Sequence, residues 1–223
     1  MNSIYKKPNA IFFDLDGTLI DSAPDLGQAA DKMRTDRGLS SLDASLYRPM
    51  AGAGARGMLK VAFDMAPDHA DFLTYREEFF TNYANSLTNQ TYAFNGIHAI
   101  LRELERQSIL WGIVTNKSKR FTEPLMVQMS VLHGATAVVS GDTTPHAKPH
   151  PAPLLEACRL AQVAPRDCWY LGDDKRDIDA GRAAGMTTLA VTWGYEGEHS
   201  LDTWQADHVL HHPQDLIALL STK

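Results

Sequence analysis

The sequence predicts an α/β fold, a Rossmann-like parallel sheet with helices on both faces and an inserted all-helical domain. Two observations carry this prediction. From about residue 93 onward, short apolar runs alternate with helical patterns, and such alternation is typical of βαβ units in a parallel sheet. The first apolar run, residues 10–13, is followed by about 75 residues without a convincing strand. We therefore expect a core domain at 1–19 and 91–223 and a helical cap domain at 20–90.

The individual elements follow from hydrophobic periodicity and from helix-start signals. Within the insertion we expect helices over residues 23–37, 57–66 and 68–87, the last with an apolar stripe that packs inside the cap. In the core we expect strands over 109–114, 135–139, 168–171 and 186–191, and helices over 97–106, 119–129, 151–161 and 177–184. Pro213 is expected to open a final helix, because proline is favoured in the first helical turn.

Composition narrows the class of protein. The chain has 223 residues, of which 44% are hydrophobic and 22% charged, as in ordinary globular domains. It contains no apolar run long enough to span a bilayer and no signal-peptide pattern. The two cysteines lack metal-ligand spacing, which favours a reducing, cytoplasmic location. The net charge of −6 argues against a nucleic-acid partner. We expect no membrane partner, and a monomer or homodimer.

Polar side chains follow four expected strands at the point where each ends. In open α/β sheets these ends meet at one edge, where ligands bind. Each group alone has an ordinary explanation as a turn, a helix cap or a surface residue. Their placement at successive strand ends is harder to dismiss. The groups are Asp14 and Asp16 after the first strand, Thr115 and Asn116 after the second, Lys148 in the loop after the third, and Asp173, Asp174 and Asp177 after the fourth.

This set of groups suits phosphoryl transfer. Clustered carboxylates repel one another unless a cation lies among them, and oxygen ligands suit Mg²⁺. A carboxylate can attack phosphorus, and a second one can transfer a proton. Asp14 and Asp16 point the same way in an extended segment, so we expect them side by side. Lys148 would supply positive charge, and Thr115 and Asn116 would bind phosphate oxygens.

Together these residues form four ordered motifs that resemble those of the haloacid dehalogenase superfamily. The motifs are residues 13–19 (FDLDGTL), 114–116 (VTN), 148–149 (KP) and 172–177 (GDDKRD). The resemblance implies Asp14 as nucleophile and Asp16 as general acid and base. It implies Mg²⁺ held by Asp14, the backbone carbonyl of Asp16 and Asp173, with Thr115 and Lys148 on the phosphoryl group. It also implies that the helical insertion is a small mobile cap.

Details within the motifs refine the resemblance. Asp16 argues against the dehalogenase and phosphonatase branches, which lack this second carboxylate. Asp174 stands where many members have Ser or Thr, so it either joins the metal site or caps a helix. Residues 19–25 (LIDSAPD) resemble the phosphoglycolate phosphatases, whereas residues 111–117 (WGIVTNK), 120–124 (RFTEP) and 172–182 (GDDKRDIDAGR) are similar to the N-acetylmuramic acid 6-phosphate phosphatases.

We therefore expect a phosphatase of a small phosphorylated metabolite, 2-phosphoglycolate first and N-acetylmuramic acid 6-phosphate as the alternative. Two less favoured alternatives share part of the motif set. A phosphosugar mutase would return the phosphoryl group to a sugar, and a signalling receiver would only accept it.

The glycine-rich segment 52–57 (GAGARG) matches a dinucleotide-binding pattern but does not follow a strand, so that function is rejected. We expect a cap loop in which Gly52 and Arg56, or Arg48, contact the substrate, with an ordinary helix–helix turn as the alternative. His146 and His150 are expected on the surface, because histidine fits poorly in an oxygen-rich metal site.

Overall fold

The computed structural model describes residues 7–195 and 201–221 and contains the expected parallel sheet. Six strands pair in the order β5-β4-β1-β6-β7-β8, and all neighbours are parallel. The first strand of the chain thus lies in the middle of the sheet. The strands are β1 (Ala10–Phe13), β4 (Leu110–Val114), β5 (Ala137–Val139), β6 (Cys168–Gly172), β7 (Thr187–Val191) and β8 (His208–Leu210).

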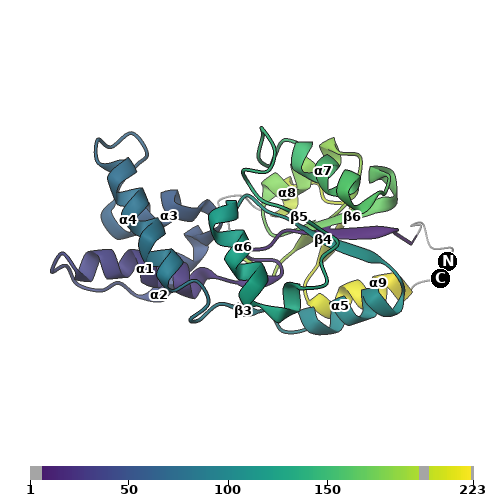
Figure 1. Cartoon of the computed structure of the whole chain (residues 1–223), viewed down its shortest axis with the longest axis horizontal. Helices are drawn as coiled ribbons and strands as arrows, with labels where there is room; N and C mark the ends of the chain where they lie inside the picture. The colour runs from purple at the N-terminus through teal and green to yellow at the C-terminus, as the bar shows by residue number, and fades with distance from the viewer. Residues whose placement is uncertain (1–6, 196–200, 222–223) are drawn as a thin grey trace.

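Helices cover both faces of this sheet, as Figure 1 shows: α5 and α9 lie on one face and α7 and α8 on the other. Alternating side chains of β1 supply both faces. Ile11 and Phe13 belong to one buried cluster, and Ala10 and Phe12 belong to another. The core helices are α5 (Ile97–Arg106), α6 (Lys119–Gln128), α7 (Ala152–Ala161), α8 (Lys175–Ala183) and α9 (Pro213–Ser221), with short 3₁₀ turns η2 (Ser130–Leu132), η3 (Pro165–Asp167) and η4 (Leu201–Thr203).

The inserted segment is helical, and Figure 1 shows it beyond one end of the sheet. It contains α1 (Ala23–Thr35), α2 (Ala44–Tyr47), the 3₁₀ helix η1 (Arg48–Ala53), α3 (Gly54–Phe63) and α4 (Phe72–Asn85). Two short strands, β2 (Ile20–Asp21) and β3 (Tyr92–Ala93), pair antiparallel where the chain enters and leaves this segment. The expected domain limits fall beside this pair of strands.

Two buried carboxylates hold the connecting segments together. Asp21 accepts hydrogen bonds from Arg48 Nη1 at 2.6 Å and Tyr92 Oη at 3.0 Å. Asp25 accepts from the backbone N–H and the hydroxyl of Thr91, at 2.8 and 2.7 Å. The first turn of α1 is therefore tied to the chain that returns to the core.

Several elements differ from the sequence prediction at their ends or were missed. β8 has three residues and only Leu210 is buried, so it lacked a visible apolar run. Helix α8 begins at Lys175, two residues before the expected start, because the Asp174 side chain caps it. Residues 44–53 are helical where no helix was expected.

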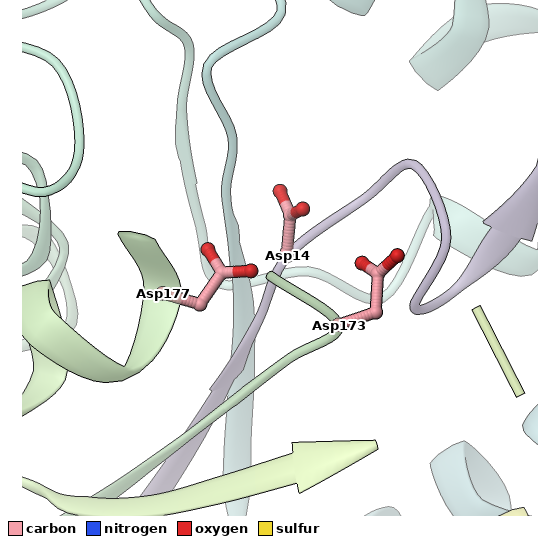
Figure 2. Close-up of side chains that lie close together, drawn as sticks. All are labelled: Asp14, Asp173 and Asp177. Atoms are coloured by element: carbon pink, nitrogen blue, oxygen red, sulfur yellow. The ribbon is translucent and has the colours of Figure 1, made fainter. Parts of the chain in front are cut away.

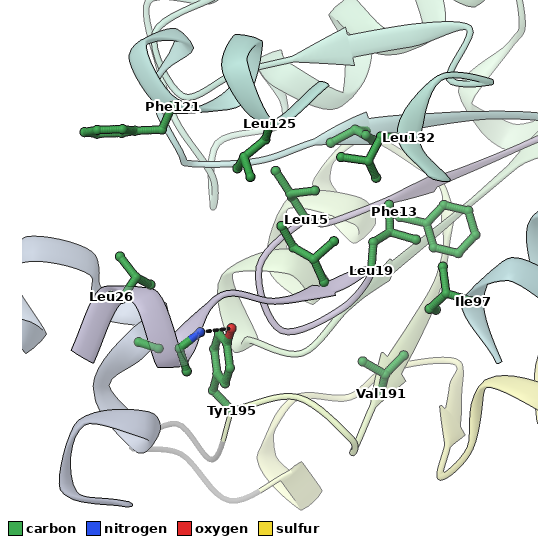
Figure 3. Close-up of a cluster of buried hydrophobic side chains, with 14 of the residues drawn as sticks. Phe13, Leu15, Leu19, Leu26, Ile97, Phe121, Leu125, Leu132, Val191 and Tyr195 are labelled. Atoms are coloured by element: carbon green, nitrogen blue, oxygen red, sulfur yellow. Dashed lines mark hydrogen bonds between the residues drawn. The ribbon is translucent and has the colours of Figure 1, made fainter. Parts of the chain in front are cut away.

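The loop that follows β1 is packed against α6 and the turn η2, as Figure 3 shows. Leu15 and Leu19 lie near Leu125 and Leu132, and all four are fully buried. This packing fixes the loop that carries the first motif. None of the helices within the described ranges combines the length and the apolar character that crossing a bilayer requires.

Candidate active site

The loop after β1 brings its carboxylates to the carboxyl edge of the sheet. The Asp14 N–H donates to the Leu171 carbonyl at 2.8 Å, which continues the β1–β6 pairing by one residue. Gly17 follows with φ at +85°, and a Cβ there would lie 2.0 Å from Asp173 Oδ2. Only glycine therefore permits both this turn and the close approach of the loop to Asp173.

Three carboxylates from two strand ends form one cluster. Oxygen atoms of Asp14, Asp173 and Asp177 all lie within 4.8 Å of one another, and Figure 2 shows the three side chains converging. Burial, followed by the charges of Asp14 and Asp177, raises the pKa of Asp173 well above its usual value. Burial also raises the pKa of Asp177 to about 7. These shifts show that the cluster holds negative charge poorly by itself, so its oxygen atoms fit a divalent cation such as Mg²⁺.

Asp173 is positioned by two segments far from it in sequence. Its Oδ1 accepts from Thr18 Oγ1 at 3.0 Å, and its Oδ2 accepts from the Tyr195 N–H at 2.9 Å. The Tyr195 hydroxyl in turn accepts from the N–H groups of Ser22 and Ala23 at the start of α1, at 2.9 and 3.1 Å. Figure 3 marks one of these bonds. Asp173 is therefore linked to the base of the helical segment.

Lys148 lies at the base of the site with its ammonium group fully engaged. Its Nζ contacts Asp14 Oδ1 at 2.8 Å, Asp177 Oδ1 at 2.7 Å, the Val114 carbonyl at 2.9 Å and Tyr170 Oη at 2.8 Å. Burial alone would lower the pKa of Lys148, but the two carboxylates raise it above the usual value. Lys148 is thus a permanent cation beside the acidic cluster.

Asp177 and Asn116 both serve to position Lys148. The other oxygen of Asp177, Oδ2, accepts from the Asp174 N–H at 3.1 Å, so both oxygens of Asp177 have protein partners. Asp177 is paired with the Lys148 cation, whereas Asp173, within the described part of the chain, accepts hydrogen bonds only from a neutral hydroxyl and a backbone N–H. The resemblance implies Asp14 and Asp173 as the metal ligands, and this assignment stays a prediction. The Asn116 amide was expected to bind phosphate, but here it bonds the backbone of Lys148. Its Nδ2 donates to the Lys148 carbonyl at 3.0 Å, and its Oδ1 accepts from the Lys148 N–H at 2.9 Å.

Asp16 lies in the same cavity but outside the acidic cluster. Lys117 Nζ contacts both of its oxygen atoms at 2.9 Å, and Ser22 Oγ donates to Oδ1. The ammonium group of Lys117 also lies 4.8 Å from the centre of the Tyr83 ring. Thr115 is buried, and its hydroxyl accepts from the Lys117 N–H at 3.1 Å. The metal contact expected through the Asp16 backbone carbonyl stays a prediction.

Asp174 caps a helix, which is one of the two roles left open above. Its side chain accepts from the Arg176 N–H at 2.8 Å and forms a capping box with Asp177. The Arg176 guanidinium bonds Asp174 at 2.7 and 2.9 Å and also donates to the Gly52 carbonyl at 2.8 Å. Arg176 thereby joins α8 of the core to η1 of the helical segment.

These groups surround one cavity of about 330 Å³ between the sheet edge and the helical segment. Its lining includes most of the residues predicted from sequence, namely Asp14, Asp16, Gly52, Thr115, Asn116, Lys148 and Asp173. Arg56 is exposed and is not among the lining residues, and Arg48 is paired with Asp21. The expected substrate contact from Arg56 therefore has no support in this geometry.

The sequence did not single out Lys117, Thr18, Tyr195 or Arg176 as site residues. Thr18 and Arg176 lie inside the motifs, and Lys117 directly follows Asn116, so proximity to a motif was an available signal. Tyr195 lies just beyond the fourth motif region, and no local pattern marks it.

The comparisons with known proteins agree with this geometry. The family model described as haloacid dehalogenase-like hydrolase matches residues 11–191. An N-acetylmuramic acid 6-phosphate phosphatase from Pseudomonas putida is 38% identical over 93% of this chain and 93% of its own length. A phosphoglycolate phosphatase from Xanthomonas campestris is 40% identical over 94% of this chain and 95% of its own length.

A crystal structure gives the same result. It shows a protein described as a predicted phosphoglycolate phosphatase from Haemophilus somnus 129pt, which is 25% identical and superposes with a TM-score of 0.83 over 96% of this chain and 98% of the other. The fold, the four motifs and the matched residues agree, and the chain belongs to the haloacid dehalogenase-like hydrolase family.

Proposed function

We propose that this protein is a Mg²⁺-dependent phosphomonoester hydrolase that acts through an aspartyl-phosphate intermediate on a small phosphorylated metabolite. The observation that carries the proposal is the arrangement around Asp14. One of its oxygens is bound by Lys148, and Asp173 lies beside it in the same acidic cluster. Asp16 faces the same cavity from outside that cluster. A nucleophile, a cation site and a proton-transfer group thus meet in one place.

The reaction has two steps. In the first, an Asp14 oxygen attacks phosphorus, the bond from phosphorus to the ester oxygen breaks, and Asp16 donates a proton to the departing alkoxide. In the second, Asp16 takes a proton from water, the resulting hydroxide attacks phosphorus, and the bond to Asp14 breaks to release phosphate. Asp14 and Asp173 would hold Mg²⁺, which would supply positive charge that offsets the phosphoryl oxygens.

We further propose that residues 20–90 act as a cap that closes the cavity from bulk water. The contact from Arg176 to the Gly52 carbonyl and the ion pair of Arg120 with Glu77, at 2.6 Å, join this segment to the core. The charged groups of the core serve the phosphoryl group, so discrimination between esters belongs mainly to the cap side. The names of the relatives supply two candidate substrates, 2-phosphoglycolate and N-acetylmuramic acid 6-phosphate.

A cytoplasmic location and a monomer or homodimer complete the proposal. The location is supported by the sequence, which contains only two cysteines, and both are buried free thiols.

The test is release of inorganic phosphate from both esters in the presence of Mg²⁺. We expect Asp14→Asn to abolish release while circular dichroism shows an intact fold. Full activity of this variant would contradict the proposal. Isomerised sugar phosphate without free phosphate would identify a mutase. A stable phosphoprotein without turnover would identify a receiver.

A further inference from the structure

Part of the cavity lining is aromatic. Phe79, Phe80 and Tyr83 of α4 and Phe121 of α6 line the cavity, and we name these four residues the aromatic wall. The rings form a connected set. The Phe80 and Phe121 centroids are 5.2 Å apart, those of Tyr83 and Phe121 are 5.1 Å apart, and Phe79 lies nearly parallel to Tyr83 at 6.2 Å. Phe79, Tyr83 and Phe121 are at most 4% exposed, so the partly exposed Phe80 offers most of the aromatic surface that a bound molecule can reach.

The rest of the cap side is also uncharged. Leu26 and residues 51–55, which are only alanine and glycine, complete it. These small side chains leave room, and their backbone groups can hydrogen-bond a ligand. A molecule with one apolar face and several hydroxyl or amide groups matches these two surfaces.

Every cationic side chain among the described lining residues already has a carboxylate partner. Lys117 pairs with Asp16 at 2.9 Å, and Lys148 pairs with Asp14 and Asp177 at 2.8 and 2.7 Å. The remaining cation, Arg176 of α8, pairs with Asp174 at 2.7 Å. Five carboxylates thus line the cavity against three cations.

A divalent cation in the acidic cluster would only balance this excess of negative charge. The phosphate group of a substrate then brings further negative charge of its own. In 2-phosphoglycolate a second anion, the carboxylate, lies one carbon from the ester oxygen and would enter this part of the cavity. Burying a carboxylate without a cationic partner is strongly unfavourable.

From the aromatic wall and this charge distribution, we infer that the leaving group of the substrate is a sugar ring, so that the substrate class is sugar phosphate esters. The inference rests on the proposed phosphatase function and deepens it. One face of the sugar ring packs on the aromatic wall, and the hydroxyl groups face the backbone of residues 51–55. N-acetylmuramic acid 6-phosphate belongs to this class, and its carboxylate is separated from the phosphate by the ring. The cavity thus favours the alternative substrate over 2-phosphoglycolate.

The test compares kcat/KM for N-acetylmuramic acid 6-phosphate, N-acetylglucosamine 6-phosphate and 2-phosphoglycolate, each with Mg²⁺. We expect both sugar esters to be preferred over 2-phosphoglycolate. Phe80→Ala should lower kcat/KM for the sugar esters by about 10-fold or more, the usual effect of lost apolar contact in a specificity pocket. The same variant should lower kcat/KM for 2-phosphoglycolate by a smaller factor, because that ester has no ring to pack on Phe80.

Phe63→Ala is the matched control. Phe63 is a half-buried aromatic residue of α3 that stacks edge-on with Tyr75 at 5.1 Å, and it does not line the cavity. Its truncation weakens packing within the cap without touching the substrate. We expect it to leave the ratio of the sugar-ester and 2-phosphoglycolate values unchanged. This ratio is also insensitive to partial unfolding, which lowers both values together.

The outcomes separate the inference from the function on which it rests. No phosphate release from any of the three esters would contradict the proposed function. Release with 2-phosphoglycolate preferred would overturn the inference and leave the phosphatase function standing. An unchanged ratio in Phe80→Ala would overturn it as well. In that case the carboxylate of 2-phosphoglycolate would be expected at the N-terminus of α3, where Gly54 and Ala55 line the cavity, because helix N-termini favour anions.

Discussion

Replacing Lys148 with methionine removes one buried positive charge and keeps most of the length of the side chain. The Lys148 side chain is only 3% exposed, and its partners Asp14 and Asp177 are 13% and 1% exposed. After the substitution, Asp14, Asp177 and the neighbouring Asp173 face one another without the cation that offsets their charge. We expect the metal-free protein to be strongly destabilised.

The size of the effect follows from the geometry. Lys148 Nζ lies 2.8 Å from Asp14 and 2.7 Å from Asp177. At an effective dielectric constant of about 20, each contact represents a gross attraction of about 6 kcal/mol. Desolvation of the buried charges offsets much of this, and breaking a buried pair from one side costs about 3–5 kcal/mol. A loss of that size lowers the Tm of a chain this long by about 6–20 °C.

The assay is thermal and urea unfolding of Lys148→Met in EDTA at pH 8 and pH 5. Destabilisation should be smaller at pH 5, because the unpaired carboxylates can then be neutralised by protonation. Lys175→Met is the matched control, since Lys175 forms a surface pair with Asp179 in which both side chains are about one-third exposed. Such a pair contributes about 0–1 kcal/mol. Equal losses in the two variants, or a larger loss at pH 5, would refute this reasoning.

Three further predictions test other parts of the site. Asp174→Ala should remove the cap of α8 and lower the unfolding free energy by about 1 kcal/mol. The Mg²⁺ affinity of this variant should be nearly unchanged. Loss of Mg²⁺ binding in calorimetric titration would instead place Asp174 at the metal. Tyr195→Phe removes the acceptor of the Ser22 N–H and leaves the Ala23 N–H with only its longer bond to Asp21 Oδ1 at 3.3 Å. Urea unfolding should show a loss of about 1–3 kcal/mol, and an unchanged midpoint would argue against this link. Because burial and the neighbouring carboxylates raise the pKa of Asp173, Mg²⁺ must displace protons, so its affinity should rise with pH; calorimetry in buffers of different ionisation enthalpy would count the protons released, and a count of zero would be inconsistent with this picture.

The predictable part of the site is the part that a parallel sheet dictates. Asp14 and Asp173 follow adjacent strands, and parallel strands deliver their ends to one edge, so their convergence follows from strand assignment alone. Thr115 follows β4, also beside β1, and enters the same cavity for the same reason. The apolar runs that identified these strands are buried on both faces, which makes them the strongest signals in the chain.

The unpredictable part depends on which partner each side chain finds. The amide of Asn116 matches a phosphate ligand in type and position, yet it bonds the backbone of Lys148, 32 residues away. Lys117 binds Asp16 across 101 residues, and no local pattern encodes that choice. In the insertion, the path of the backbone decides which residues reach the cavity. Residues 48–53 form a 3₁₀ helix that brings Gly52 to the cavity, while Arg56 is exposed.

The distribution of charge explains why one catalytic core can serve different esters. The core contributes all five carboxylates and all three cations among the described lining residues, and we propose that these groups, with a bound metal ion, hold the phosphoryl group. The cap adds only uncharged side chains and backbone to the described lining. A substitution on the cap side can therefore change the leaving group that is accepted while every charged group of the core stays in place. A cation introduced at Ala53, on the cap side of the cavity, would be the smallest change able to favour a carboxylate-bearing ester over a sugar.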